Sequence, residues 1–154
     1  MRNRRLVALT TALTFLLLLV GVFTKEVGAD LTCGMNWPLC DGAVYGLFPA
    51  NLPSAVEWFH RLLALVVGLL ILYLLYRLSR DRGWGDRVTR AVTVAVLLLP
   101  VQALLGALTV TKARFGLTSL LAGAAISVAH YATGVALFTA LVVGTVWAYE
   151  DWRW

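Results

Sequence analysis

Four long apolar stretches constrain the fold of this chain more than any other feature of its sequence. Three of them carry no Asp, Glu, Lys or Arg. The other one, residues 54–76, is interrupted only by Glu57, His60 and Arg61. A helix that crosses a bilayer needs about 20 such residues. Because 60% of the residues are hydrophobic and only 14% are charged, the composition excludes a water-soluble enzyme and a disordered chain. In chain order, the stretches are residues 6–24, 54–76, 91–111 and 115–149.

The sequence therefore predicts an all-α membrane protein, a single domain over residues 1–154 built as a bundle of four transmembrane helices. A helix satisfies its own backbone hydrogen bonds in lipid, which an open sheet does not do. The last apolar stretch is longer than one bilayer crossing, so its first residues are assigned to a loop. The predicted spans are residues 6–24, 54–77, 91–111 and 119–148, with a long loop at 25–53.

The distribution of basic residues predicts the orientation of the bundle. Arg and Lys are enriched in cytoplasmic segments, and most of the thirteen lie in the N-terminal segment, the 78–90 loop and the C-terminal tail. The loops at 25–53 and 112–118 hold only three. We therefore expect both termini to be cytoplasmic and the 25–53 loop to be extracytoplasmic, in a multi-pass protein of the cell membrane. A cleavable signal sequence is disfavoured, because the first apolar run exceeds the usual length of about 7–15 residues.

Both cysteines of the chain, Cys33 and Cys40, lie in the 25–53 loop. An extracytoplasmic compartment is oxidising, which favours a disulfide between them. Such a disulfide is either a stabilising link or a redox-active, reducible pair. A metal site is the weakest interpretation, because two thiols without a nearby cluster of His or carboxylate groups make a poor zinc site.

Each of the two histidines of the chain lies inside a predicted span. Ionisable side chains are costly in a membrane and are candidates for function. His60 lies about 9 Å and His130 about 16 Å from the outer end of its span, at 1.5 Å per residue. Two imidazoles at comparable depth could bind one iron from opposite sides, as axial ligands do in heme proteins. The small residues on the same helix faces leave room for a macrocycle; they are Ala64, Gly68, Gly123, Ser127 and Gly134. Alternatively, these small residues only let the helices pack closely, and the histidines hydrogen-bond across them.

Glu57 lies one helical turn before His60, on the same face of the predicted helix. It is either a solvated carboxylate in the first turn, where the helix dipole favours it, or a partly desolvated group that moves protons in the same pocket. Arg61 could pair with Glu57 through an i,i+4 contact or meet a porphyrin propionate. Lys112 and Arg114 are further cations on the outer side that could hold propionates.

Several motifs of this chain, taken together and in order, resemble those of heme A synthases. Residues 21–42, with both cysteines, resemble the first span and loop of that family. Residues 57–64 read Glu-Trp-Phe-His-Arg-Leu-Leu-Ala and resemble its E-x-x-H-R element. Residues 102–110 resemble its third span, and His130 stands where the family has its second ligand histidine. The resemblance covers nearly every part of the chain.

The resemblance implies a membrane enzyme that oxidises the C8 methyl group of heme O, through hydroxylated intermediates, to the formyl group of heme A. It implies a heme b cofactor, with heme O as the substrate and heme A as the product for terminal oxidases. Glu57 would be the catalytic carboxylate, and His60 and His130 would be the axial ligands of a heme iron. Cys33 and Cys40 would form a disulfide or a transient thiol partner for the substrate.

The chain departs from the family in its number of spans. Members usually have eight, in two similar halves with a histidine pair in each, whereas this chain has four predicted spans and one pair. We therefore expect a homodimer or a higher homo-oligomer, in which another copy supplies the missing half. Heme O synthase and a terminal oxidase are candidate partners.

Two other classes of function are compatible with the same residues. A non-enzymatic heme b protein could carry electrons or heme with His60 and His130 alone. A thiol–quinone oxidoreductase could use Cys33 and Cys40 as its working pair, but the closer C-x-x-C spacing and the second pair of such enzymes are absent from the sequence. Replacement of both cysteines separates this last class from a heme-modifying enzyme, because heme modification persists if the thiols are not the reaction centre.

Overall fold

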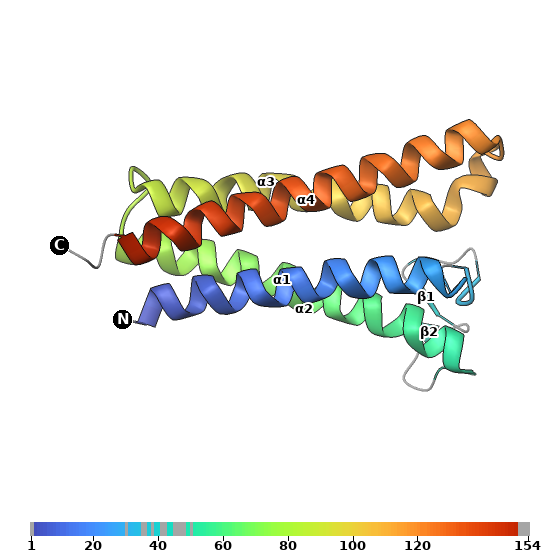
Figure 1. The fold of residues 1–154 in the computed structure, drawn as a ribbon, viewed down its shortest axis with the longest axis horizontal. Coiled ribbons are helices and arrows are strands. Elements are labelled where there is room, and N and C mark those ends of the chain that lie inside the picture. The colour runs from blue at the N-terminus through green and yellow to red at the C-terminus, as the bar shows by residue number, and fades with distance from the viewer. Residues whose placement is uncertain are drawn as a thin grey trace.

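Four antiparallel helices make up most of the computed structural model (Figure 1). It describes residues 2–29, 31–34, 37, 39–40, 43–44, 49 and 51–150. Each helix is long and apolar enough to cross a membrane, which confirms the predicted four-helix membrane fold. The first and the last of the described residues lie at one end of the bundle, here called the terminal end, and the opposite end is called the loop end (Figure 1). The helices are α1 (Arg2–Glu26), α2 (Leu52–Asp81), α3 (Arg87–Thr111) and α4 (Leu120–Glu150).

Side-chain caps set the starts of the two central helices. Asn51 caps α2, where its side chain accepts a hydrogen bond of 2.9 Å from the backbone N–H of Ser54. Asp86 caps α3 by accepting from the backbone N–H groups of Val88 and Thr89. Such caps satisfy N–H groups that the helix leaves unpaired. Because these caps, and not the ends of the apolar stretches, set the helix starts, α2 and α3 begin two and four residues earlier than the predicted spans.

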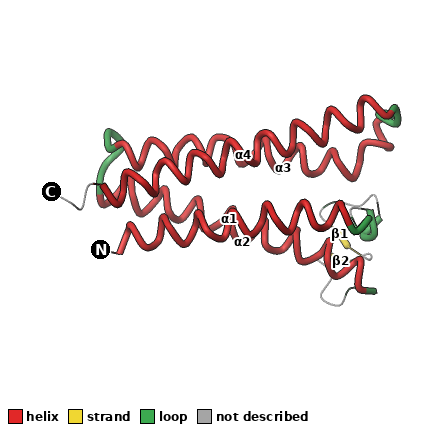
Figure 2. The backbone as a smooth tube through the Cα atoms, viewed as in Figure 1, coloured by secondary structure: helices red, strands yellow, loops and turns green. Residues whose placement is uncertain are grey.

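The loop end carries two small elements that the apolar pattern does not predict. A short 3₁₀ helix, η1 (Lys112–Phe115), follows α3 and ends at Gly116, whose φ of 69° suits glycine. The strands β1 (Leu39–Cys40) and β2 (Ala43–Val44) form one antiparallel pair in the Cys-bearing loop (Figure 2). These elements close the two connections at the loop end.

The apolar core lies in the terminal half of the bundle. α3 packs most extensively on α4, and α1 contacts both α2 and α4. The fully buried aliphatic side chains come from the N-terminal parts of α1 and α3 and the C-terminal parts of α2 and α4. The polar residues singled out above lie on the other side of this core, toward the loop end. The core residues are Val7, Val67, Ile71, Leu74, Leu78, Val88, Val92, Ala95, Leu137, Leu141 and Ala148.

Polar contacts also fasten the terminal half. The hydroxyls of Thr11 on α1 and Thr145 on α4 lie 2.8 Å apart. The Asn3 amide donates to Asp81 at 2.9 Å, which joins α1 to α2. Hydrogen bonds between helices contribute to association in lipid, where no hydrophobic effect drives it. The terminal half therefore holds the packed apolar core of the bundle, and the loop half carries the candidate functional residues.

Candidate functional site

Each histidine side chain packs against a glycine of the neighbouring helix. His60 lies about 12 Å from the start of α2 and His130 about 15 Å from the start of α4, at 1.5 Å per residue. A Cβ atom built on Gly21 of α1 would lie 2.9 Å from His60 Cε1. A Cβ atom built on Gly106 of α3 would lie 3.2 Å from His130 Cε1. The rings therefore occupy space that only a glycine leaves open.

The same pairing thus occurs twice in the fold. In each helical hairpin, α1–α2 and α3–α4, a glycine on the first helix faces a histidine on the second. Each glycine lies about a turn and a half before the end of its helix. The sequence analysis missed both glycines as site residues, although each is the only glycine in its apolar stretch. A lone glycine in a long apolar helix was the signal that could have found them.

If the two histidines bind a heme, as the sequence analysis predicts, Gly21→Ala is expected to weaken its binding, and Gly106→Ala to do so to a smaller extent. The closer contact is at Gly21, and overfilling a packed site costs enough to lower affinity by about fivefold or more. Gly85→Ala is the matched control, because a Cβ there meets no atom of the described chain within 4 Å and the residue lies at the terminal end, away from the histidines. Heme titration of the purified variants measures the effect. Equal affinities for Gly21→Ala and Gly85→Ala would contradict it.

Three buried polar atoms, on the two histidines and on a neighbouring tryptophan, have no hydrogen-bond partner within the part of the chain that the structure describes. They are Nδ1 of His60, Nδ1 of His130 and Nε1 of Trp58. Buried polar groups are nearly always paired, so each exception calls for an explanation such as a ligand or an ion. Each ring therefore keeps a nitrogen with which it can bind a ligand.

This donor set fits a heme better than a bare metal ion. Among the described residues, no group of three or more His, Cys, Asp or Glu could hold a metal, and a structural zinc ion takes four protein ligands. A heme brings its own ring of four nitrogens and takes only axial ligands from the protein. His60 and His130, each with an unpaired ring nitrogen, match that requirement.

Gln102 and Thr133 fix the position of α4 beside His130. The Thr133 hydroxyl lies 2.6 Å from Gln102 Oε1 and 3.1 Å from the backbone carbonyl oxygen of His130. Gln102 Nε2 and Leu18 each lie 3.1 Å from the place that a Cβ on Gly134 would take. Gly134 thus admits side chains of α3 and α1 to the surface of α4, which locks three helices together next to one histidine.

Glu57 is a buried carboxylate that joins α2 to the Cys-bearing loop. It is 3% exposed, and its Oε1 forms an ion pair with Arg61, itself 8% exposed. Its Oε2 accepts hydrogen bonds from the backbone N–H of Cys33 at 2.7 Å and from the Thr32 hydroxyl at 3.2 Å. A buried charge persists only when it is paired and hydrogen-bonded. The i,i+4 pairing with Arg61 is as expected, whereas the contacts with the loop were not anticipated.

Cys33 and Cys40 form a disulfide, as the sequence analysis favours. Both sulfur atoms lie over the first turn of α2, 3.8 and 3.9 Å from the carbonyl oxygen of Ser54. The Ser54 hydroxyl donates to the carbonyl oxygen of Thr32 at 3.3 Å. The disulfide is therefore packed on the helix that carries Glu57 and His60, one turn from the carboxylate.

The cations of the loop end are placed differently from one another. Lys112 is partly buried, with its Nζ 3.6 Å from the place that a Cβ on Gly123 would take, on the helix of His130. Arg114 is exposed in η1. Lys25, which the sequence analysis did not single out, lies 5.4 Å from the ring centroid of Tyr131, the neighbour of His130. Lys25 and Lys112 therefore both lie against the helix of His130.

Comparison with known proteins identifies the family. Residues 52–152, about two thirds of the chain, match the family model described as Cytochrome oxidase assembly protein, COX15-CtaA. The chain belongs to the COX15-CtaA family. The matched region includes Glu57, His60 and His130, together with α3 and η1.

Members of two enzyme groups are similar to this COX15-CtaA chain over nearly its whole length. Heme A synthase of Bacillus licheniformis is 30% identical over 143 residues, which cover 92% of this chain and 44% of that protein. Heme A synthase of Bacillus pumilus is 32% identical, over 97% and 46%. Protoheme IX farnesyltransferase of Haloarcula marismortui is 35% identical, over 94% and 28%. The chain thus spans less than half the length of these relatives. No solved structure matches it.

Proposed function

We propose that this chain is a heme A synthase, which oxidises the C8 methyl group of heme O to the formyl group of heme A for terminal oxidases. The observation that carries the proposal is the pair of intramembrane histidines, each packed on a glycine and each with an unpaired ring nitrogen. The similarity to heme A synthases over more than nine tenths of the chain supports it. The resemblance of the motifs at 57–64 and 102–110 points the same way.

His60 and His130 would hold the heme iron as axial ligands. When bound, a heme supplies the redox chemistry, with heme b as the cofactor and heme O as the substrate. Within the protein, Gly21 and Gly106 set how near each imidazole ring approaches its neighbouring helix. The cations Arg61, Lys112 and Arg114 are proposed to hold the propionates of the porphyrin, since Arg and Lys pair with carboxylates.

Glu57 is proposed as the catalytic carboxylate. It is buried on the helix of His60, one turn from that ligand, and is held by Arg61 and by the Cys33 backbone. A carboxylate in such a setting can hold or move a proton at Oε1 or Oε2 close to a bound substrate. Cys33 and Cys40 join the same network through the loop that Glu57 anchors, so we propose that they act on the substrate side of the site.

The proposed surroundings of the enzyme follow from the same features. We propose that the Cys-bearing loop lies outside the cell membrane and both termini in the cytoplasm, because basic residues are enriched in cytoplasmic segments and concentrate at the terminal end. A homodimer or higher homo-oligomer would supply a counterpart to the part of the relatives that this chain does not match. A heme O synthase is the proposed upstream partner, since a farnesyltransferase that acts on protoheme IX contains a segment similar to this chain.

A heme b protein that carries electrons or heme is the second candidate. It is favoured by the histidine geometry alone, which needs neither Glu57 nor the disulfide. A thiol–quinone oxidoreductase ranks third, because the closer C-x-x-C spacing and the second cysteine pair of such enzymes are absent from the sequence. The first two candidates differ in whether the bound heme is changed.

The deciding experiment uses the protein purified from membranes of a host that makes heme O. The redox difference spectrum is recorded, and the hemes are extracted and separated. We expect heme A or hydroxylated heme O, absent from an empty-vector control. Heme b alone, with a bis-His low-spin spectrum, would contradict the synthase and favour the carrier. A monodisperse monomer that is active with one heme per chain would contradict the homo-oligomer.

A further inference from the structure

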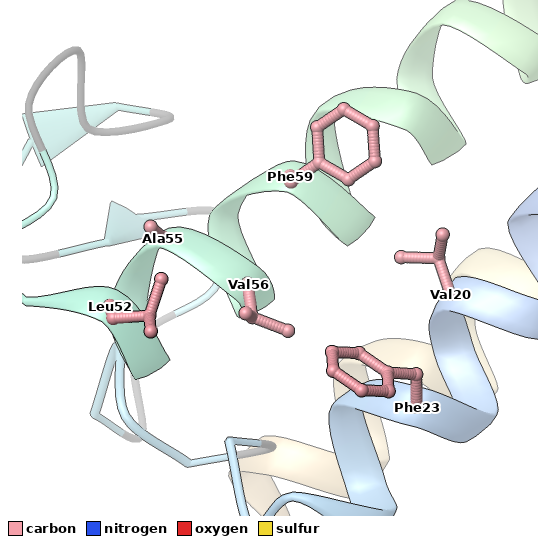
Figure 3. A pocket seen from close by; sticks show the side chains of 6 residues that line it. All are labelled: Val20, Phe23, Leu52, Ala55, Val56 and Phe59. Carbon is pink, nitrogen blue, oxygen red and sulfur yellow. The ribbon is translucent and has the colours of Figure 1, made fainter.

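An apolar groove lies between α1 and α2 near the loop end. Its volume is about 370 Å³, which is within the range of about 300–1,000 Å³ for small-molecule sites. In Figure 3, Val20 and Phe23 point from α1 toward α2, and Val56 points from α2 toward α1. No charged or hydrogen-bonding side chain is among the described residues that line it. The lining residues are Val20, Phe23, Leu52, Ala55, Val56 and Phe59.

The groove and the contact of His60 with Gly21 both lie between α1 and α2. Two lining residues are sequence neighbours of that pair, since Val20 precedes Gly21 and Phe59 precedes His60. The groove and the His60 ring thus belong to the same α1–α2 interface. A molecule held at His60 would extend along this interface into the groove without crossing the apolar core, which lies in the terminal half.

The groove is also open to the surface that faces lipid. Phe23 is 55% exposed and Phe59 45% exposed, although both line the groove. An amphiphilic substrate dissolved in the membrane can therefore enter from the side. Once inside, its apolar part would meet only hydrocarbon and aromatic side chains, while its ring reaches the polar level of Glu57 and His60.

We propose that this groove binds the isoprenoid tail of a prenylated heme whose ring lies at His60 and His130. The inference rests on the proposed function and adds to it a site for the tail. The chain is similar both to a farnesyltransferase of protoheme IX and to heme A synthases. A farnesylated heme joins a flat ring to a long linear hydrocarbon, and the fold offers a histidine pair beside a groove of matching chemistry.

The groove should select the tail by its shape more than by its hydrophobicity. Lipid tails are as apolar as the groove, so transfer of the tail from the membrane gains little free energy. Filling the groove with a larger side chain should therefore exclude the tail and leave the ring unaffected. Ala55 is the smallest lining residue and lies five positions before His60, which makes it the natural position for such a change.

The test compares binding of heme O and heme b to Ala55→Phe, Ala55→Leu and wild type in detergent. We expect Ala55→Phe to lower heme O affinity about tenfold, because the larger side chain would occupy space proposed for the tail, with heme b affinity unchanged. Ala55→Leu should give a smaller change in the same direction and serves if the Phe variant does not fold. Ala136→Phe, at an exposed position of α4, is the matched control and should bind both hemes as wild type does.

Two outcomes overturn the inference. One is wild-type affinity of the folded Ala55 variants for heme O, and the other is an equal loss of both hemes. A groove that holds only a membrane acyl chain would leave the ratio of heme O to heme b affinity unchanged. Heme binding requires no turnover, so the two proposals can fail separately. If the Ala55 variants lose affinity for heme O alone but the protein makes no heme A, the proposed activity is wrong and the groove assignment stands. If the Ala55 variants bind heme O as wild type does and the protein makes heme A, the groove assignment is wrong and the proposed activity stands.

Discussion

His60→Ala and His130→Ala are each expected to abolish stable heme binding. Each histidine would supply one axial ligand, and each lies in a different helical hairpin. Removal of even a supporting group around a metal ligand typically costs about 10–100-fold in affinity, so loss of the ligand itself should cost at least that. The heme content of purified protein, from the absorption spectrum and from extraction, measures the effect.

Added imidazole provides a specific check on this role. The alanine variants leave a space for a free imidazole, which should restore part of the low-spin spectrum if the missing ring was a ligand. Thr139→Ala, at an exposed position of α4, is the control and should retain wild-type heme content. A wild-type spectrum in either histidine variant would show that this residue is not an axial ligand.

Glu57→Gln is expected to keep heme and to lose heme O oxidation by about 10²–10⁴-fold, the range that a general acid or base contributes. Glutamine retains an oxygen that can accept from the Cys33 N–H and the Thr32 hydroxyl. It removes the charge and the ability to take up a proton. The rate of heme A formation, set against the heme spectrum of the same sample, measures the two effects separately.

Glu57→Ala should show a second effect, on stability. It leaves the Arg61 guanidinium without its buried carboxylate partner and removes the acceptor from the Cys33 N–H. Breaking a buried pair in this way costs about 3–5 kcal/mol in soluble proteins, so the thermal midpoint should fall below that of Glu57→Gln. Thr32→Val, which removes one donor and leaves the carboxylate, is the control for the loop contact. Full activity of Glu57→Gln would refute the catalytic role.

The sequence is sufficient to predict the four helices and to single out the two histidines as candidate site residues. Uncharged stretches of the right length specify spans in a membrane, and intramembrane His60 and His130 stand out because such residues are rare there. The pairing of Glu57 with Arg61 could also be predicted, since i,i+4 neighbours share a helix face. These features depend on a single helix at a time.

The contacts between elements could not be predicted in the same way. The approach of Gly21 to His60 depends on how α1 and α2 are rotated about their axes, which hydrophobic periodicity leaves open in helices that are apolar all round. The bond from the Cys33 N–H to Glu57 crosses a 24-residue separation through a loop without apolar pattern. The β1–β2 pair contains two residues in each strand, too few for strand patterning to be visible.

Maturation of the protein in the membrane should proceed in two stages, because the apolar core occupies only the terminal half of the bundle. That half can associate by itself, through packed aliphatic side chains and the Thr11–Thr145 contact. If His60 and His130 bind one heme as proposed, the loop half would gain further cohesion, because the heme would cross-link the α1–α2 and α3–α4 hairpins. Ligand binding to the folded form alone adds about 2.7 kcal/mol at a hundredfold excess over Kd. The cellular supply of heme would then govern how many chains survive proteolysis long enough to act.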